Sequence, residues 1–277
     1  MYPRIELGPL TLYTYGLMLA LGLGVGIGLM CWEFRRKGLD PAHGVWIGLI
    51  AVSSGVVGAR LLFLIEEWDR FVVDPIGVTL SSGGLSFYGG LILAALAIYA
   101  YVRWNRIGFL VFGDAAAPGA LLARGIGRIG CHLSGDGDYG LPTTLPWGTD
   151  YSNGIYPPSA ALARFPELTR GFPGGVAPDN LPMHPTGVYE FLLSALLFAV
   201  LWRYRSRMRL DGGVFMLYLL ATGGLRFGLE FLALTPRIAL GLTEGQLISL
   251  GLIVIGAAGL WHLRARPVAL SPLVRAR

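Results

Sequence analysis

Charged side chains are scarce in this chain. They make up 14% of its 277 residues, and Lys37 is the only lysine. Soluble domains carry about 25% charged residues, so this composition argues against a soluble globular domain. The net charge of +5 does not indicate nucleic-acid binding, because the arginines lie in short separate stretches and form no single basic face. Hydrophobic residues reach 54%, with a mean hydropathy of +0.59, which is typical of a membrane protein with several spans.

Cysteine is equally scarce. Cys31 and Cys131 are the only two, and they fall in or beside different apolar segments. This excludes a disulfide framework and the paired spacing of a zinc site. The first residues, "MYPRIELGPLTLYTYGLML", lack both a basic region and a small-residue cleavage site. We therefore expect a retained amphipathic lead-in and not a signal peptide.

Long apolar segments recur along the whole chain. A membrane-spanning helix needs about 20 mainly apolar residues. Seven segments meet this length, near residues 13–34, 44–65, 85–104, 108–131, 186–204, 214–234 and 245–263. The sequence therefore predicts an all-α membrane protein with seven transmembrane helices, forming one integral membrane domain over residues 1–277.

The basic residues predict an orientation. With the N-terminus outside, the inside stretches hold 13 positive residues and the outside stretches hold 5. The positive-inside rule favours this arrangement, which places the C-terminus in the cytoplasm. The inside count includes four arginines late in the chain or in the third inside loop: Arg209, Arg266, Arg275 and Arg277. The long segment 132–185, here called the cap, is then extracytoplasmic. Its Trp147, Tyr151, Tyr156 and Phe165 predict that it is partly ordered, since disordered linkers contain few aromatics.

Four further arginines lie inside the apolar segments, where each costs roughly 2.5–3.5 kcal/mol at the bilayer centre: Arg60, Arg124, Arg128 and Arg226. Arg226 precedes Glu230 by four residues, so the two share a helix face and form either an internal ion pair or part of a cationic site. Arg124 and Arg128 have the same spacing and repel each other unless an anion bridges them. No acid that would pair with Arg128 is evident, so we expect it to bind an anionic group.

The stretch "GRIGCHLSGDGDYG" follows directly. Its glycines permit close backbone approach and could line an anion-binding nest. A calcium loop at "DGDYG" is disfavoured because no glutamate follows at the required spacing. Cys131 and His132 are weak candidates for a nucleophile and its base, because the side chains of sequence neighbours point apart. No metal or cofactor is expected. Asp114, earlier in the same helix, is expected to pair with a buried arginine.

Seven short motifs in order resemble the prolipoprotein diacylglyceryl transferase family along nearly the whole chain: "LGPLTLYTYGLMLALG", "GARLLF", "LSFYGGLI", "GRIGCHLSGDGDYG", "HPTGVYEFL", "LRFGLEF" and "LTEGQLISL". The resemblance implies a seven-helix enzyme of the bacterial plasma (inner) membrane. Such enzymes move the diacylglyceryl group of phosphatidylglycerol onto the lipobox cysteine of a preprolipoprotein and release glycerol 1-phosphate, without a cofactor. An anionic lipid substrate and a phosphate-ester leaving group both suit buried arginines.

The resemblance also assigns residues. Arg128 matches the signature arginine that contacts the lipid phosphate, and Arg226 with Glu230 matches the helix-6 pair. The candidate catalytic residues are Tyr88, His132, Asp136, Arg226 and Glu230. The candidate lipid-binding residues are Arg128, Tyr15, Arg226, Arg60 and Gly140. Asp136 and Gly140 stand near the signature acid and glycine, but they are one residue further apart than in the family.

Three departures from the family pattern bear on proton transfer. Tyr88 stands where a histidine is usual, Cys131 where an asparagine is usual, and Thr222 where a tyrosine is usual. The thiol of the acceptor needs a base or a positive field, and His132 or His184 could supply the base. Two alternatives stay open: a divergent relative that uses another lipid or acceptor, and a non-enzymatic protein that binds or transports anionic lipids.

Overall fold

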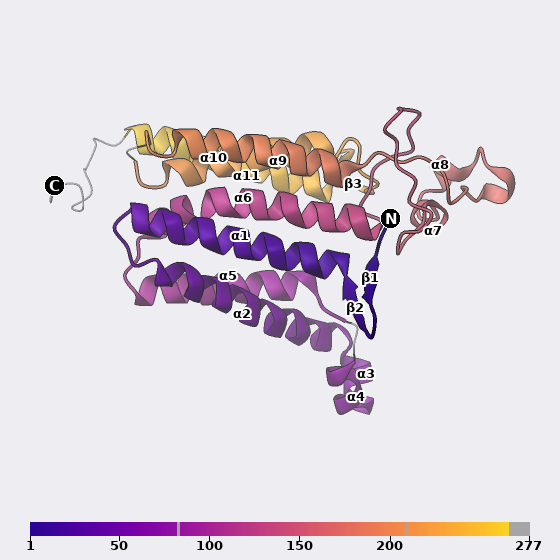
Figure 1. The fold of residues 1–277 in the computed structure, drawn as a ribbon, viewed down its shortest axis with the longest axis horizontal. Coiled ribbons are helices and arrows are strands. Elements are labelled where there is room, and N and C mark those ends of the chain that lie inside the picture. The colour runs from indigo at the N-terminus through magenta and orange to yellow at the C-terminus, as the bar shows by residue number, and fades with distance from the viewer. Residues whose placement is uncertain (82–83, 209, 266–277) are drawn as a thin grey trace. The chain divides into compact units, whose positions relative to one another are not determined.

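The computed structural model describes residues 1–81, 84–208 and 210–265. Arg209, Arg266, Arg275 and Arg277, which entered the orientation argument, lie outside the described residues. In chain order the elements (Figure 1) are β1 (Arg4–Leu7), β2 (Leu10–Tyr13), α1 (Thr14–Arg36), α2 (Ala42–Glu66), α3 (Trp68–Val73), α4 (Pro75–Leu80), α5 (Phe87–Trp104), α6 (Phe109–Ser134), α7 (Pro158–Leu162), α8 (Pro166–Thr169), the 3-10 helix η1 (Pro173–Gly175), α9 (Thr186–Tyr204), α10 (Gly213–Leu229), β3 (Arg237–Ala239), β4 (Leu242–Thr243) and α11 (Glu244–Ala265).

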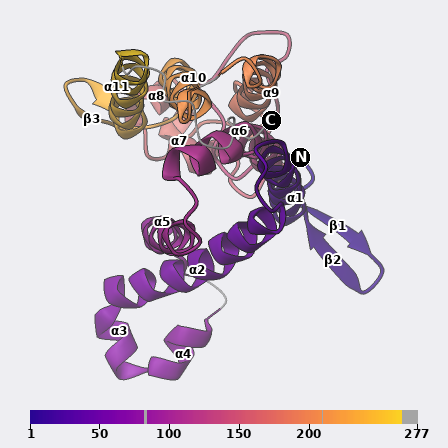
Figure 2. The same ribbon diagram turned by 90° about the vertical axis from the view of Figure 1, so that its left-hand side faces the viewer.

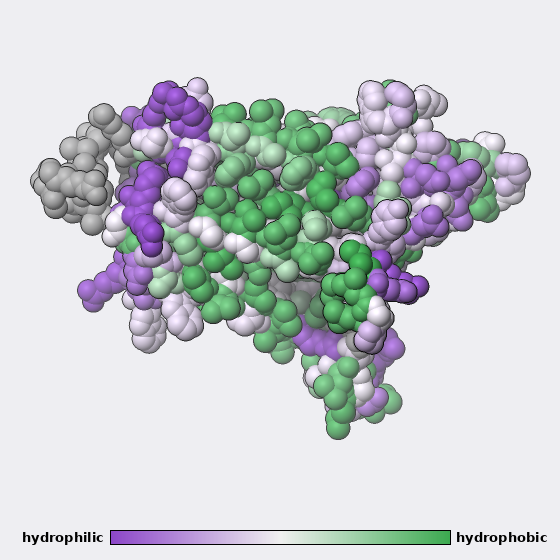
Figure 3. Space-filling model, viewed as in Figure 1, coloured by the Kyte–Doolittle hydropathy of each residue, from purple (hydrophilic) through white to green (hydrophobic). Residues whose placement is uncertain are grey.

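The protein is mostly helical, as predicted. Within the described ranges, six helices are long and apolar enough to cross a membrane: α1, α2, α5, α6, α9 and α11. Figure 3 shows hydrophobic side chains gathered over the middles of the long helices, with hydrophilic ones towards their ends. The sequence did not predict the two short antiparallel hairpins, β1–β2 and β3–β4.

The sixth predicted segment, 214–234, is wrong at its C-terminal end. Helix α10 has 17 residues and ends at Leu229. The chain beyond it leaves the helix because its backbone bonds elsewhere: the Leu141 amide donates to the Leu232 carbonyl at 2.8 Å, and Gly140 forms a β-bridge with Ala233. Apolar composition alone could not reveal this competing partner.

The contacts divide the chain into two compact units. One comprises residues 27–115, and the other comprises residues 1–26 and 116–277. In the first unit, α2 packs on α5 through glycines. A β-carbon added at Gly58 would lie 2.4 Å from the Gly89 carbonyl oxygen, so the two backbones are in direct contact. Small residues at such crossings are usual where membrane helices pack closely.

The second unit contains α6, α9, α10, α11 and the cap. Figures 1 and 2 show α9, α10 and α11 side by side, with α6 next to them. Glycines again permit the approach: a β-carbon at Gly187 on α9 would lie 2.5 Å from the Arg128 carbonyl oxygen on α6, and one at Gly223 on α10 would lie 2.9 Å from the Ser249 carbonyl oxygen on α11. The α6–α9 contact brings the buried polar side chains of both helices together.

The cap has a small hydrophobic core of its own, formed by Tyr139, Tyr151, Leu162, Ala177 and Met183. The rings of Tyr139 and Tyr151 stack with centroids 4.3 Å apart, and the Tyr139 hydroxyl donates to the Tyr156 carbonyl at 2.7 Å. Among the aromatics that predicted order, Tyr151 is buried in this core, whereas Trp147 and Tyr156 are exposed.

Candidate active site

A single buried carboxylate, Glu190, organises the arginines of the second unit. It lies in the second turn of α9, and its side chain is 1% exposed. Arg124 Nε donates to Glu190 Oε1 at 2.6 Å, and Arg128 Nε lies 2.9 Å from Glu190 Oε2. Arg226 Nη1 approaches the same Oε2 at 3.6 Å. Two arginines of α6 and one of α10 therefore converge on one acid of α9.

This arrangement corrects one expectation from the sequence. An anion does bridge Arg124 and Arg128, but Glu190 of the protein itself supplies it. The expectation that Arg128 has no acidic partner is also wrong. Glu190 and Asp138 both pair with it.

The second acid on Arg128 comes from the loop after α6. Arg128 Nη1 pairs with the Asp138 carboxylate, and Nη2 donates to the Asp138 carbonyl at 3.1 Å. The Thr186 hydroxyl donates to the same carbonyl at 3.0 Å. Gly135 and Gly137 have φ of +59° and +92°, so the loop adopts a turn that favours glycine and folds back over Arg128. The Asp138 side chain is 62% exposed, whereas that of Arg128 is 16% exposed.

The predicted pair of Arg226 and Glu230 is present. Arg226 Nε lies 2.9 Å from Glu230 Oε2, and the Glu230 side chain is fully buried. Neither carboxylate oxygen of Glu230 accepts a hydrogen bond from the residues that the structure describes. A β-carbon at Gly245, in the first turn of α11, would lie 2.7 Å from Oε2, so the Glu230 carboxylate lies directly against the backbone of α11. Arg226 therefore compensates the charge of this buried carboxylate, while the remaining lone pairs of its oxygens are free to meet a ligand.

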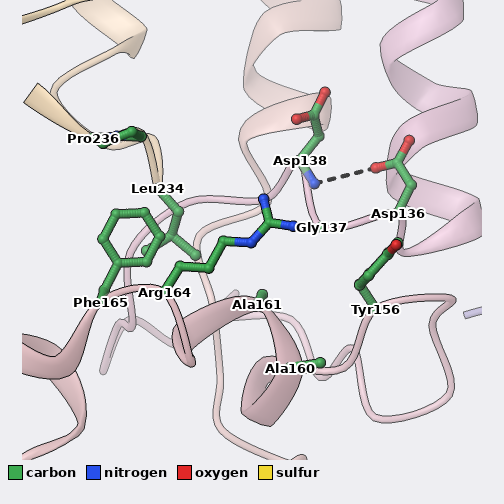
Figure 4. A pocket seen from close by; sticks show the side chains of 10 residues that line it. All are labelled: Asp136, Gly137, Asp138, Tyr156, Ala160, Ala161, Arg164, Phe165, Leu234 and Pro236. Atoms are coloured by element: carbon green, nitrogen blue, oxygen red, sulfur yellow. Dashed lines mark hydrogen bonds between the residues drawn. The ribbon is translucent and has the colours of Figure 1, made fainter. Parts of the chain in front are cut away.

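Two cavities adjoin these acids. The first, of about 380 Å³, has both loop acids, Asp136 and Asp138, in its wall, with Tyr156 and Arg164 (Figure 4). The second, of about 350 Å³, has Glu230 in its wall. The two cavities share four lining residues: Arg164, Phe165, Leu234 and Pro236. A ligand in either one would therefore lie beside an acid that pairs with an arginine of the cluster.

Asp136 lies in the wall of the first cavity. Its carboxylate accepts a hydrogen bond from the Asp138 amide at 3.2 Å, and burial raises the pKa of the Asp136 carboxyl above its ordinary value. The ligand atoms of Cys131, Asp136 and Asp138 lie within 4.8 Å of one another, close enough to reach one metal ion. Asp138 is already paired with the Arg128 guanidinium, so this set suits a cation poorly.

Replacing Asp136 with asparagine is expected to raise the unfolding temperature at pH 7. The folded state binds the proton of Asp136 more tightly than the unfolded state does, because its pKa is raised. Stability is therefore lost as the pH rises from the unfolded pKa of about 3.9 through the folded value. Asparagine has no charge to bury, and its carbonyl still accepts from the Asp138 amide.

Thermal unfolding in detergent at pH 7 and pH 4 measures this effect. The gain should shrink at pH 4, and Asp69→Asn, which changes an exposed aspartate, should shift neither curve. An Asp136→Asn protein that is less stable at pH 7 than at pH 4, relative to the parent, would contradict the assignment.

The histidines considered as bases both have phenolic partners. His132 Nδ1 lies 2.8 Å from the Tyr151 hydroxyl, and His184 Nδ1 lies 3.2 Å from the Tyr189 hydroxyl. Burial raises the pKa of Tyr151 above its ordinary value, so this phenol stays protonated. The contact joins the last turn of α6 to the cap core.

Gly140 and Tyr15 both lie at backbone crossings. A β-carbon at Gly140 would lie 2.4 Å from the Leu232 carbonyl oxygen, and the Gly140 amide donates to the His184 carbonyl at 2.9 Å. Gly140 is thus where the segments after α6, before α9 and after α10 meet. Tyr15 lies in the first turn of α1 and packs its backbone against Gly130 of α6.

Arg60, Tyr88 and Asp114 belong to the unit of residues 27–115. Arg60 donates to the carbonyls of Thr79 at 2.5 Å and of Gly84 at 2.7 Å, and so ties α2 to α4 and to Gly84. Tyr88 lies in the first turn of α5 and is exposed. The expected arginine partner of Asp114 stays a prediction; the partner that the structure describes is Lys37, whose Nζ lies 3.2 Å from Asp114 Oδ2.

Sequence reasoning missed Glu190, Asp138 and Arg164. A signal for Glu190 was present, because it is an acid inside a predicted span, and such residues are rare and functional by default. Asp138 and Arg164 carry no such signal, since acids and arginines are common in loops.

Comparison with known proteins identifies the family of this chain. The family model described as prolipoprotein diacylglyceryl transferase matches residues 4–262. Three similar proteins are each named phosphatidylglycerol–prolipoprotein diacylglyceryl transferase. The one from Clostridium tetani is 32% identical over 91% of this chain and 93% of its own. Those from Dehalococcoides mccartyi and Corynebacterium diphtheriae are 31% and 30% identical, over 90% and 94% of this chain and 88% and 91% of their own.

Proposed function

This chain belongs to the prolipoprotein diacylglyceryl transferase family, and we propose that it transfers the diacylglyceryl group of phosphatidylglycerol to the lipobox cysteine of preprolipoproteins. The thiolate sulfur attacks the glyceryl carbon that carries the phosphate. The carbon–oxygen bond to the phosphate breaks, and its electron pair leaves on the phosphate oxygen of glycerol 1-phosphate. The thiol proton passes to a base, so the transfer balances without a cofactor.

The observation that carries this proposal is the pairing of Arg128 with an exposed acid. Glu190 fixes the Nε edge of Arg128 from inside the protein, while Asp138 occupies its outer edge. Because Asp138 is 62% exposed, an anionic ligand can take its place without uncovering a buried charge. An arginine fork suits a phosphate, whose charge grows as the carbon–oxygen bond breaks. Arg226, on the same Glu190 oxygen, adds a second cation.

Glu230 is the favoured proton acceptor among the candidates. It is buried, lines the second cavity and has oxygens that accept no hydrogen bond from the described residues. His132 has its Nδ1 engaged with Tyr151, and a tyrosine such as Tyr88 is a poor base at its ordinary pKa of about 10. Asp136 lies on the leaving-group side, beside Asp138, and suits contacts with the head group.

The remaining candidates are Tyr15, Arg60, Tyr88 and Gly140, and none of them belongs to the arginine cluster. Tyr15 offers a half-exposed phenol where α1 contacts α6. Arg60 and Tyr88 stay candidates within the unit of residues 27–115, where Arg60 donates to the carbonyls of Thr79 and Gly84. Gly140 permits the close crossing that places Asp138 over Arg128.

We further propose seven spans in the bacterial plasma membrane, with α10 as the sixth. Its 17 residues reach about 25 Å, a little short of the hydrocarbon core of about 30 Å. Local thinning of the bilayer or the turn after Leu229 makes up this difference. With the N-terminus outside, the cap is extracytoplasmic and the C-terminus is cytoplasmic, in keeping with the excess of arginines inside.

Reporter fusions test this orientation. Alkaline phosphatase inserted after Asn153 in the cap should be active, because this enzyme folds only outside the cytoplasm. Green fluorescent protein inserted after Ser206, between α9 and α10, should fluoresce. The reversed pair of signals at equal expression would overturn the proposed orientation.

Complementation tests the activity itself. A bacterial strain depleted of its own diacylglyceryl transferase should recover growth and lipidated lipoproteins when it expresses this chain. A purified preparation should move labelled diacylglyceryl from phosphatidylglycerol to a lipobox peptide. A well-expressed protein that does neither would contradict the proposal, and transfer from a different lipid alone would identify a divergent relative.

A further inference from the structure

Arg164 has an unusual place in the cap. It lies between α7 and α8, its side chain is exposed, and it makes no hydrogen bond or ion pair with any residue in the described ranges. It is one of four residues that line both cavities. Figure 4 shows its side chain extending past Phe165 and Leu234 towards Gly137, on the loop that carries Asp136 and Asp138. The cap thus presents an unpaired cation to the acids beside Arg128.

The lining of the first cavity limits what it can bind. Arg164 supplies a positive fork on one side, and Asp136 and Asp138 supply carboxylates on the other. A simple anion would face two acids, and a simple cation would face Arg164. A small molecule with a phosphate at one end and hydroxyls at the other satisfies both sides, since hydroxyls donate to carboxylates and arginine donates to phosphate. A cavity of about 380 Å³ lies within the usual range for small-molecule sites, about 300–1,000 Å³.

The second cavity has a different character. Its wall includes Glu230, the buried acid with no hydrogen-bond donor among the described residues. The proton acceptor and the leaving-group acids therefore line separate hollows, with Arg164 between them. An acceptor thiol that approaches through one cavity would not need to pass the group that departs through the other.

We propose that the first cavity is the site for the glycerol phosphate head group, and that Arg164 binds its phosphate as it leaves Arg128. This inference rests on the proposed function. In the lipid complex, the phosphate displaces Asp138 from Arg128, and the glycerol hydroxyls donate to Asp136 and Asp138. After the carbon–oxygen bond breaks, the phosphate moves to Arg164. Asp138 then returns to Arg128 and closes the arginine cluster behind the product.

Direct binding of glycerol 1-phosphate to the full chain in detergent tests the site apart from catalysis. Isothermal titration should show that Arg164→Gln weakens binding by roughly tenfold or more, the effect of losing one charge-assisted contact. Arg170→Gln is the matched control, because Arg170 is an exposed arginine of the cap that lines neither cavity. Equal affinity for the parent and Arg164→Gln would overturn the proposal.

Kinetics give a second measurement. Arg164→Gln should raise the inhibition constant of glycerol 1-phosphate. It should leave the KM for phosphatidylglycerol and the KM for the lipobox peptide unchanged, because Arg164 meets the phosphate only after the carbon–oxygen bond breaks. Arg164→Lys should restore part of the affinity for glycerol 1-phosphate, since lysine keeps the charge but loses the planar fork. A raised KM for the peptide alone would assign the cavity to the acceptor and overturn the head-group site. If the parent protein transfers nothing from phosphatidylglycerol, the proposed function fails; an active parent with an unaltered Arg164→Gln variant refutes the head-group site alone.

Discussion

Replacing Glu190 with glutamine is expected to destabilise the protein by about 3–5 kcal/mol, the usual cost of removing one partner from a buried ionic cluster. Glu190 forms ion pairs with Arg124, Arg128 and Arg226. Glutamine keeps the shape but removes the negative charge. Three buried or half-buried cations would then repel one another, with Asp138 and Glu230 left as their partners.

The measurement is thermal unfolding in detergent, together with the yield of folded protein from membranes. Glu67→Gln is the matched control, because Glu67 pairs with Arg70 at the surface, and such pairs contribute about 0–1 kcal/mol. Glu190→Asp should fall between the two, since the shorter side chain keeps the charge but cannot reach both α6 arginines. An unfolding temperature of Glu190→Gln equal to that of Glu67→Gln would show that the cluster does not depend on this acid.

The sequence predicted the elements that depend on local pattern. Apolar length predicted the long helices, and the i,i+4 spacing predicted the Arg226–Glu230 pair, because both residues lie on one helix. Glu190 could not be matched to its arginines in this way. It lies 66 residues from Arg124, and only the packing of α9 on α6 brings the two together.

The loop acids show the same limit. Asp138 reaches Arg128 because Gly135 and Gly137 adopt positive φ angles, a backbone path that composition permits but does not specify. Asp114 pairs with Lys37, directly after α1, and only helix packing brings these two distant residues together. The end of α10 was set by a strand-like partner at Gly140. Each miss involves contacts between segments distant in the chain.

Replacing Arg128 with alanine is expected to lower the turnover number of transfer by about 100- to 1,000-fold, the usual cost of losing a donor to a developing negative charge. Arg128→Lys should recover only part of the turnover. A lysine ammonium lacks the planar guanidinium, which can pair with Glu190 on one edge and with a phosphate on the other. The KM for phosphatidylglycerol should change less than the turnover, since the contact strengthens as the phosphate oxygen gains charge. Arg170→Ala is the control. Full activity in Arg128→Ala would leave Arg128 as an anchor for the loop and remove it from the chemistry.

The pair of Arg226 and Glu230 requires a different experiment, because a single replacement leaves a buried charge without a partner. Replacing both together with methionine and leucine removes one positive and one negative charge and fills similar volume. Folding should tolerate this change, since exchanging a buried pair for apolar residues is often neutral, while breaking one side costs about 3–5 kcal/mol. Glu190 would still bridge Arg124 and Arg128.

If the pair only supports the bundle, the double variant should keep its transfer activity. If Arg226 binds the phosphate and Glu230 takes the thiol proton, the double variant should insert and unfold like the parent but transfer no diacylglyceryl to a lipobox peptide at matched protein levels. We expect the second result, because the Glu230 carboxylate, held by Arg226, lines a cavity that a ligand can enter.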